Sequence, residues 1–338
     1  MNERVYVQTN DAERNEVIAF DRSGDGRLSP LGSYETGGRG TGKPHLASQS
    51  SVVLGDEGSW LLVANAGSDE VSLFAVEPDG LRLAGRIGSG GSGPTSIAVR
   101  GGLVYALNNG TPGFSGFTLG DDGLAPLDGS RRELGADADP AQIAFSPDGG
   151  TIVVTERGTN SITTFAVDER GYAGEPETIP SSGATPYGFD FANGSIVVTE
   201  AFGGEIGKAA ASSYSLAGPR RLEPLSASVA GTRSEVCWAV ATPDGRFVYV
   251  TNFGDGTVSS YAVRQGGELE LLEAVAGSTG LGVPGLRDEA LSRDGHFLYA
   301  IDADAQRVFG WSVDDDGRLE QIGEFEGVPL TVAGLAAS

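Results

Sequence analysis

The sequence contains very little cysteine, lysine or histidine. Among 338 residues there are one cysteine (Cys237), two lysines (Lys43 and Lys208) and two histidines (His45 and His296). A single thiol cannot form a disulfide within the chain, so the fold does not depend on disulfide bonds. Two distant histidines and one cysteine also do not provide the ligand spacing of a zinc site.

Long apolar runs are absent as well. No stretch approaches the roughly 18–20 apolar residues that a membrane-spanning helix requires. The strand-like stretch RVYVQTN already occupies residues 4–10, which leaves no room for a signal peptide in the sequence as it stands. The compartment therefore stays open: cytoplasmic if the chain is complete, secreted if a leader has been removed.

Positive charge is scarce. Acidic residues number 46 against 23 basic ones, for a formal net charge of −23. A surface field of this sign repels polyanions, so neither nucleic acid nor an anionic membrane is expected as a partner. Solubility alone can explain the acidity, which therefore says little about function.

Glycine, by contrast, is abundant. The chain has 53 glycines and 16 prolines, and few stretches are long enough to form a helix without interruption. Short alternating runs of β-forming residues fill the intervals between glycine-rich turns. The composition therefore favours an all-β fold.

One hairpin unit recurs along the whole chain. RFVYVTNFGDGTVSSYAV at 246–263 is a typical copy, with two alternating runs around a glycine-containing turn. A repeat period of 43–55 residues indicates a solenoid or a propeller. In seven copies the first run is followed by a polar residue, namely Asn10, Asn65, Asn108, Glu156, Glu200, Asn252 and Asp302.

Each unit has two further strand-like segments. A short apolar strand precedes the hairpin, as in WAVATPDGR at 238–246, and a fourth strand follows it, as in QGGELELLEAV at 265–275. We therefore expect a seven-bladed β-propeller with four antiparallel strands per blade, formed as a single domain by residues 1–338. Each hairpin would then pack its faces against the blades on either side.

The two ends of the chain fit a closed ring. The N-terminus begins with the second strand of a blade, whereas PLTVAGLAAS at 329–338 is a first strand with no hairpin after it. We expect the C-terminal strand to pair with the N-terminal blade. This pairing would close the ring and cover two sheet edges that would otherwise be open to aggregation.

A propeller gathers its entry loops, and the loops between its second and third strands, on one face around a central channel. This face would suit a small anionic or carboxylated molecule held by charge-assisted hydrogen bonds. Neutralisation of neighbouring acidic groups is the alternative role of its cations. The cations expected on these loops are Arg39, Lys43, Arg131, Arg132, Arg157, Lys208, Arg233, Arg287 and Arg307.

Four residues on this face are candidates for catalysis. His45, at the start of a channel-lining strand, could exchange protons near neutral pH. Glu156 and Glu200 stand where other blades have asparagine, and could form an acid–base or cation-holding pair or act as simple turn acceptors. Arg157 follows Glu156 and could stabilise negative charge.

Other residues of the same loops and inner strands are candidates for substrate binding. Cys237 is interpreted as a packing residue, because no second cysteine and no clear histidine partner support a nucleophile. His296 follows an SRDG turn on the opposite face and is set aside. The substrate-binding candidates are Lys43, Gln142, Tyr187, Glu235, Trp238 and Arg287.

No cofactor and no metal site are expected, with an oxygen-ligated divalent cation at the channel mouth as the alternative. The protein is expected to act on a small molecule as a monomer.

Several motifs resemble a known family. VYVTN at 248–252, the turns SPDG, TPDG and SRDG, and DG-x-L hairpin tips together resemble the lactonase family of seven-bladed propellers. This family includes bacterial 6-phosphogluconolactonases and fungal carboxymuconate lactonising enzymes. PHLASQSSVVL at 44–54 and EAFGG at 200–204 are similar to its lactonase or carboxymuconate-cyclase-like members. The resemblance implies chemistry on lactones by His, Arg and Glu side chains around the channel, without a nucleotide cofactor.

Two functions are therefore predicted as alternatives. The first is a lactonase-like enzyme, a lactone hydrolase or a lactonising (cyclo)isomerase, that opens or closes a lactone or related carboxylated ring by acid–base catalysis at the channel mouth. The second is a non-catalytic propeller that binds a ligand or a protein, since the fold alone does not determine function.

Overall fold

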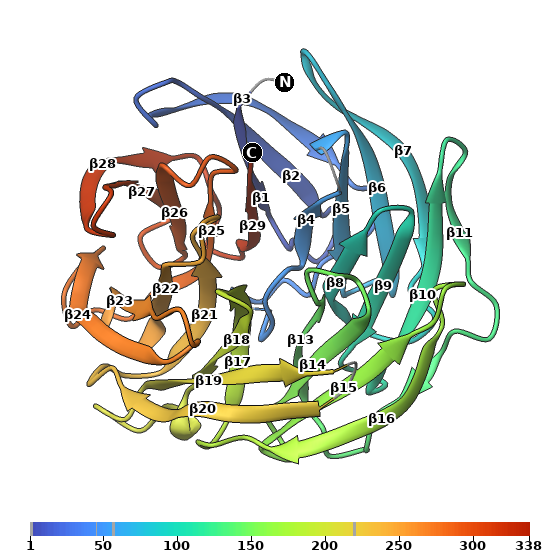
Figure 1. Ribbon diagram of the computed structural model, residues 1–338. Coiled ribbons are helices and arrows are strands. Elements are labelled where there is room, and N and C mark those ends of the chain that lie inside the picture. Colours follow the sequence, from blue (N-terminus) through green and yellow to red (C-terminus); the bar gives the residue numbers. More distant parts are fainter. Residues whose placement is uncertain (1–2, 45, 56–57, 219–220) are drawn as a thin grey trace.

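The computed structural model describes residues 3–44, 46–55, 58–218 and 221–338. These residues form seven antiparallel sheets arranged as blades around a central channel (Figure 1). The predicted all-β, seven-bladed propeller is thus confirmed. In the part of the chain that the structure describes, no helix is long and apolar enough to cross a membrane.

Each blade runs from a first strand at the channel to a fourth strand at the rim. In blade 3 the fourth strand is divided, and both parts pair with β10. Blades 1 to 3 consist of β29 (Ala333–Ala337), β1 (Arg4–Gln8), β2 (Glu16–Arg22) and β3 (Leu28–Glu35); β4 (Val52–Leu54), β5 (Trp60–Asn65), β6 (Glu70–Glu77) and β7 (Gly80–Gly88); and β8 (Pro94–Arg100), β9 (Leu103–Asn108), β10 (Gly113–Gly120), β11 (Gly123–Pro126) and β12 (Arg132–Glu133).

Blades 4 to 7 follow the same order. They consist of β13 (Pro140–Phe145), β14 (Thr151–Glu156), β15 (Ser161–Val167) and β16 (Ala173–Pro180); β17 (Pro186–Ala192), β18 (Ser195–Glu200), β19 (Ala210–Ala217) and β20 (Arg221–Ala230); β21 (Val236–Ala241), β22 (Phe247–Asn252), β23 (Thr257–Val263) and β24 (Leu269–Ser278); and β25 (Leu286–Leu291), β26 (Phe297–Asp302), β27 (Arg307–Val313) and β28 (Leu319–Glu326). Two short 3-10 turns, η2 (Phe202–Gly204) and η3 (Phe253–Asp255), follow β18 and β22.

The core lies between the blades. Successive side chains of a strand point to opposite faces, and in β22 this sends Val248 and Val250 against blade 5 and Tyr249 against blade 7. Within the described residues, a hydrophobic cluster fills each of the seven junctions between neighbouring blades. A hairpin that could not bury both faces alone is therefore buried by its two neighbours.

In blades 4, 6 and 7 the turn after the first strand follows from a short motif. In SPDG, the Ser146 hydroxyl donates a hydrogen bond to Asp148 Oδ1 at 2.5 Å, and Gly149 adopts a positive φ of 76°. The TPDG and SRDG turns repeat this arrangement in blades 6 and 7. A hydroxyl, an acceptor and a glycine at fixed spacing thus define the return into the second strand.

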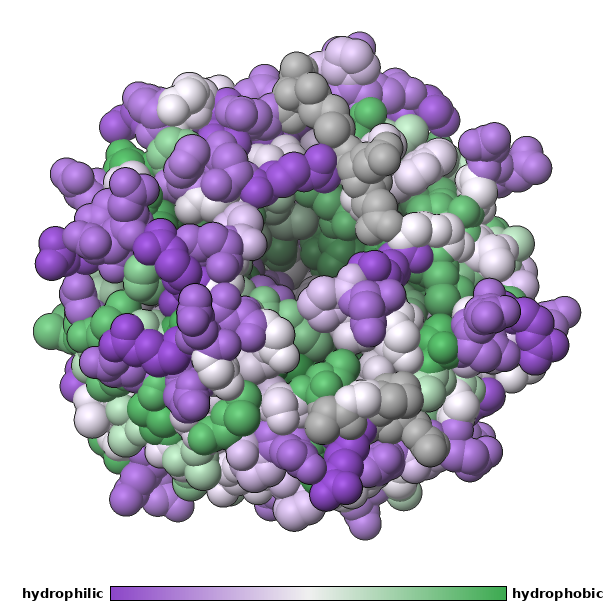
Figure 2. All heavy atoms as spheres, viewed as in Figure 1, coloured by the Kyte–Doolittle hydropathy of each residue, from purple (hydrophilic) through white to green (hydrophobic). Residues whose placement is uncertain are grey.

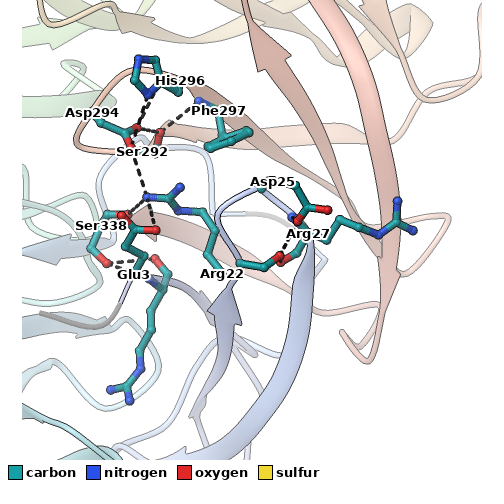
Figure 3. Close-up of polar contacts among 12 residues, drawn as sticks. Glu3, Arg22, Asp25, Arg27, Ser292, Asp294, His296, Phe297 and Ser338 are labelled. Atoms are coloured by element: carbon teal, nitrogen blue, oxygen red, sulfur yellow. Dashed lines mark hydrogen bonds and ion pairs between the residues drawn. The ribbon is translucent and has the colours of Figure 1, made fainter.

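The ring closes as predicted, by pairing of β29 with β1. Arg22 of β2 strengthens this junction (Figure 3): its guanidinium donates to the Ser338 carbonyl at 3.2 Å and forms ion pairs with Glu3 at 3.3 Å and Asp294 of blade 7 at 3.5 Å. The guanidinium also lies 5.0 Å from the ring centre of Phe297. One buried cation therefore joins both chain ends to the last blade.

Candidate functional site

The central channel is divided by the segment that leads from blade 1 into blade 2. Figure 1 shows this blue segment, between β3 and β4, reaching into the centre of the ring. Gln49 donates to the Ala239 carbonyl at 2.7 Å and accepts from the Ala239 amide at 3.0 Å. Ser48 donates to the Ala141 carbonyl and accepts from the Trp238 indole at 3.2 Å. We call residues 46–50 the plug, because it ties blade 2 to blades 4 and 6 across the channel.

A cavity of about 330 Å³ lies on one side of the plug, over Ala47, which packs against Tyr187, Cys237 and Trp238. Its walls come from blades 4 to 7, and we call it the upper cavity. It is lined by Asp139, Arg157, Gly158, Thr185, Tyr187, Ala201, Gly203, Gly204, Glu235, Cys237, Phe253 and Arg287.

Three of the lining side chains occupy the same position in successive blades. Asp139, Thr185 and Glu235 each directly precede the first strand, with φ of 43°, 57° and 54°. Blades 3 and 7 have Gly93 and Gly285 there, also at positive φ. In all five blades, the carbonyl of this residue accepts a hydrogen bond from the amide of the residue that follows the second strand.

This backbone position favours glycine, so a side chain there carries strain. Strained non-glycine residues concentrate at functional sites, where a particular side chain is needed. In blades 4, 5 and 6 this strained position places the carboxyl of Asp139, the hydroxyl of Thr185 and the carboxyl of Glu235 in the lining of the upper cavity.

The two arginines of the upper cavity differ in their partners. Arg157 Nη2 pairs with Asp139 Oδ1 at 2.6 Å, and its guanidinium lies 4.8 Å from the ring centre of Tyr187. Arg287 is 7% exposed and its guanidinium lies 4.6 Å from the ring centre of Phe253. Among the described residues its Nε has no hydrogen-bond partner. Burial lowers the pKa of Arg287, but an arginine remains charged at neutral pH. Arg287 is thus the cation available to an anionic group.

Glu235 supplies the opposite charge. Burial raises the pKa of this half-buried carboxyl above its usual value, and the positive charge of Arg287 opposes the rise. Gly204 forms the wall beside it: a Cβ at position 204 would lie 3.7 Å from the Glu235 carboxyl carbon. The small residue leaves the carboxyl open to the upper cavity.

Tyr187 and Cys237 remain protonated at neutral pH. Burial raises the pKa of the Tyr187 hydroxyl well above its usual value, and burial likewise raises the pKa of the Cys237 thiol. The Cys237 thiol donates to the Glu235 carbonyl at 3.5 Å. A thiol that does not ionise is a poor nucleophile, so it serves here as an apolar part of the wall.

The structure places the Glu156 and Glu200 carboxylates inside their own blades rather than on the upper cavity. Glu156 accepts hydrogen bonds from Thr159 at 2.8 Å and Thr163 at 2.6 Å. Glu200 is fully buried and accepts from the Gly183 amide and the Ser228 hydroxyl, both at 2.7 Å. Asn65, Asn108 and Asn252 end the equivalent strands and also bond to nearby hydroxyl groups.

Three more predicted site residues lie elsewhere, and a fourth is not described. Gln142 bridges blades 4 and 5 through two hydrogen bonds to the backbone of Phe189. Trp238 lies beneath the wall, with its ring centre 5.8 Å from that of Tyr187. Lys43 is exposed and is not part of the lining. His45 falls outside the described residues.

The cations predicted for this face also lie in different places. Arg157 and Arg287 line the upper cavity, whereas Arg307 pairs with Glu326 at 2.9 Å, Arg131 bonds to the Gly90 carbonyl and Arg132 bonds to carbonyls of blades 3 and 4. In the described ranges, no group of three histidine, cysteine, aspartate or glutamate side chains is placed to hold a metal ion.

Sequence reasoning missed Asp139, Thr185 and Phe253. Their place in the repeat could have identified two of them, because Asp139 and Thr185 directly precede Pro140 and Pro186, the first residues of β13 and β17. Aligning the copies at this residue shows glycine in blades 3 and 7 and the cavity-lining Asp139, Thr185 and Glu235 in blades 4 to 6.

Comparison with known proteins agrees with the fold. The family model "Lactonase, 7-bladed beta-propeller" matches residues 2–119, 124–201 and 200–333. No curated protein matches the sequence.

Solved structures of similar architecture include a candidate 6-phosphogluconolactonase from Bacteroides uniformis, with a TM-score of 0.77, 21% identity and coverage of 98% of this chain and 99% of that one. A second candidate 6-phosphogluconolactonase, from Bacteroides fragilis, has a TM-score of 0.76, 17% identity and coverage of 100% and 98%. A periplasmic gluconolactonase from Pseudomonas aeruginosa has a TM-score of 0.76, 18% identity and coverage of 100% and 99%.

Proposed function

Because the chain belongs to the lactonase family of seven-bladed β-propellers, we propose that its upper cavity hydrolyses a small lactone that carries a carboxylate. The observation that supports this most directly is that Glu235 and Arg287 line one cavity: a half-buried carboxyl with a raised pKa lies there together with a buried arginine that forms no ion pair among the described residues. The lactonase names of the structural neighbours point in the same direction.

The cavity limits the size of the substrate. About 330 Å³ is at the low end of small-molecule sites, which suits a monocyclic lactone rather than a polymer. Arg157 is already neutralised by Asp139 and stacked on Tyr187, so it is proposed to orient the substrate through hydrogen bonds. Arg287 is proposed to donate charge-assisted hydrogen bonds to the substrate carboxylate or to the reacting carbonyl oxygen.

Glu235 is the proposed general base. It takes a proton from water, and the water oxygen attacks the lactone carbonyl carbon. The negative charge that develops on the carbonyl oxygen is stabilised by Arg287. The ring C–O bond then breaks and protonated Glu235 returns its proton to the leaving oxygen, which yields a hydroxy acid. Run in reverse, the same groups would close the ring.

The test is a pH–rate profile on a panel of γ- and δ-lactones with and without a carboxylate. Wild-type kcat/KM should fall on the acidic side with an apparent pKa above the ordinary glutamate value of 4.5, since the base must be ionised. Glu235→Gln should remove this acidic limb and lower kcat about 10²–10⁴-fold. Glu205→Gln, an exposed glutamate on the η2 turn, is the matched control and should retain the wild-type profile.

Two outcomes would contradict the proposal. Unchanged turnover in Glu235→Gln would exclude Glu235 as the base, and His45→Ala in the same assay would test the histidine predicted from the sequence. A carboxylated ligand that raises the melting temperature but is never turned over would indicate the binding propeller instead.

A further inference from the structure

A second cavity, of about 460 Å³, lies on the other side of the plug. Gln49 and Ser50 of the plug contribute to its lining, together with the first strands of blades 2, 5, 6, 7 and 1. We call it the lower cavity. Most of the lining is aliphatic, including Val53, Val240, Leu291, Leu335 and Ala336. Figure 2 shows such a hollow at the centre of the ring, with hydrophobic (green) walls inside a hydrophilic (purple) rim.

Three carboxyl groups and the exposed Arg293 interrupt this aliphatic wall. Asp288 and Glu289 are neighbours on β25 and each is 2% exposed. Asp190 of β17 accepts hydrogen bonds from the amides of Phe191 and Ala241, both at 2.8 Å. None of the three carboxyls forms an ion pair with another described residue. The ion pairs that the described residues do form join arginines to other acids, with one histidine–aspartate pair.

Glu289 is the least satisfied of the three. Within the described chain, both of its carboxyl oxygens and Asp288 Oδ2 are buried and make no hydrogen bond of normal geometry, although the backbone amides of Thr251 and Leu335 lie near enough to oppose the rise that burial causes in the pKa of Glu289 and of Asp288. An unpartnered buried carboxyl costs several kcal/mol of folding free energy if it is charged. The positions equivalent to Glu289 in blades 4, 5 and 6 are Ile143, Phe189 and Ala239, since each pairs with the residue two before the end of the second strand. The propeller itself therefore does not require an acid there.

We propose that the lower cavity is a second binding site, for a small organic ammonium ion with a short apolar chain. A primary ammonium carries three N–H donors and a positive charge, which suits a cavity lined by the buried carboxyls of Asp288 and Glu289. The aliphatic wall would contact the carbon chain and remove it from water. A hydrated metal ion fits less well, because the described side chains form no group that could coordinate one.

The electrostatics of the cavity predict how binding depends on pH. Burial raises the pKa of Asp288 to about 8, and burial together with the charge of Asp288 raises the pKa of Glu289 well above its usual value. Enclosure also raises the pKa of Asp190 to about 6. An ammonium favours the ionised carboxylates, so binding near neutral pH should release protons. Affinity should rise from about pH 6 to pH 9, because an alkylamine stays protonated up to a pKa near that of lysine, about 10.

The experiment is calorimetric titration of the full chain with n-butylamine at pH 7, in two buffers of different ionisation enthalpy. The expected result is saturable binding with net proton release, and no binding of 1-butanol, which has the same chain without the charge. Glu289→Gln and Asp288→Asn should each weaken butylamine binding at least 10-fold. Glu320→Gln, an exposed glutamate on β28 of the same blade, should leave it unchanged.

Three results would overturn the proposal: equal binding of 1-butanol, unchanged butylamine affinity in both variants, or saturable binding of Ca²⁺ with none of butylamine. Melting curves of each variant confirm that it is folded before titration. The site is independent of the upper cavity, so its failure would leave the lactonase proposal untouched.

Discussion

The two ends of the central channel carry opposite chemistry on the same scaffold. In the upper cavity each carboxyl has a cation near it: Asp139 pairs with Arg157, and the positive charge of Arg287 opposes the rise that burial causes in the pKa of Glu235. In the lower cavity Asp288 and Glu289 form no ion pair with any described residue, since Arg293 of the same lining is exposed at the rim, and their pKa values rise instead. The plug separates the two ends through Ser48 and Gln49. One ring thus has a buried arginine in the cavity on one side and buried acids in the cavity on the other.

The difference arises from single positions within identical blades. Arg287 and Glu289 lie two residues apart on β25, yet they line different cavities. Blades 5 and 6 place Tyr187 and Cys237 at the position of Arg287, and Phe189 and Ala239 at that of Glu289. The repeat determines where each side chain lies along the channel, and the residue type determines what that end of the channel can bind.

The largest effect should come from Arg287→Ala. Loss of the available cation of the upper cavity should lower kcat/KM for a carboxylated lactone about 10²–10³-fold, the usual cost of losing one donor to a developing oxyanion. Arg318→Ala, an exposed arginine of blade 7, serves as the matched control in the same steady-state assay. Equal activity in the two variants would show that the upper cavity is not the reaction site.

Gln49→Ala should have the next largest effect, because it removes the hydrogen bonds that hold the plug to blade 6. The buried amide and carbonyl of Ala239 would lose their partner, which should cost about 2–4 kcal/mol of unfolding free energy. Denaturant unfolding measures this against Gln265→Ala on an exposed hairpin tip. A loss under about 0.5 kcal/mol, typical of surface substitutions, would mean that the two cavities are not separated by a rigid plug.

The pH dependence of stability should show the smallest effect within any one pH unit, and it should distinguish the two ends of the channel. The pKa of Asp288 is about 8 in the folded protein, far above the value of 3.8 for an ordinary aspartate. Its protonated form therefore stabilises the fold fully below about pH 4, and this contribution is lost as the pH rises through about 8. For one titrating group, the free energy of unfolding falls by at most about 1.4 kcal/mol per pH unit. Unfolding curves between pH 5 and pH 8 should converge for wild type and Asp288→Asn at low pH, and parallel curves would contradict an unpaired acid.

Much of the architecture was predictable because it rests on local patterns. The alternation in β22 and β23 and the Ser–Asp–Gly spacing of the turns act within a few residues, so each repeat could be recognised by itself. The orphan strand at 329–338 predicted the closure that β29 makes with β1. The Arg22 contacts that strengthen this closure were not predictable, since they join residues 3, 22, 294 and 338.

The site was predictable only in part. Arg157, Tyr187, Glu235 and Arg287 were candidates and line the upper cavity. Glu156 and Glu200 looked equally suitable in the sequence, but their carboxylates turn into the blade toward hydroxyl groups of the third strand and of the segments beside it. Whether an acid at the end of a strand faces the channel or its own blade depends on those hydroxyl donors, which lie up to 28 residues away in the chain.

The sequence by itself determined the number of blades, their strand order and the closure of the ring, because each depends on short-range periodicity and on turn residues. Only the tertiary structure decided that residues 46–50 cross the channel and divide it, that three strained residues before the first strands line one cavity, and that Asp288 and Glu289 are buried in another. These features depend on contacts between residues that are far apart in the chain. The energy of a buried charge depends on the groups that surround it, and only the folded structure brings those groups together.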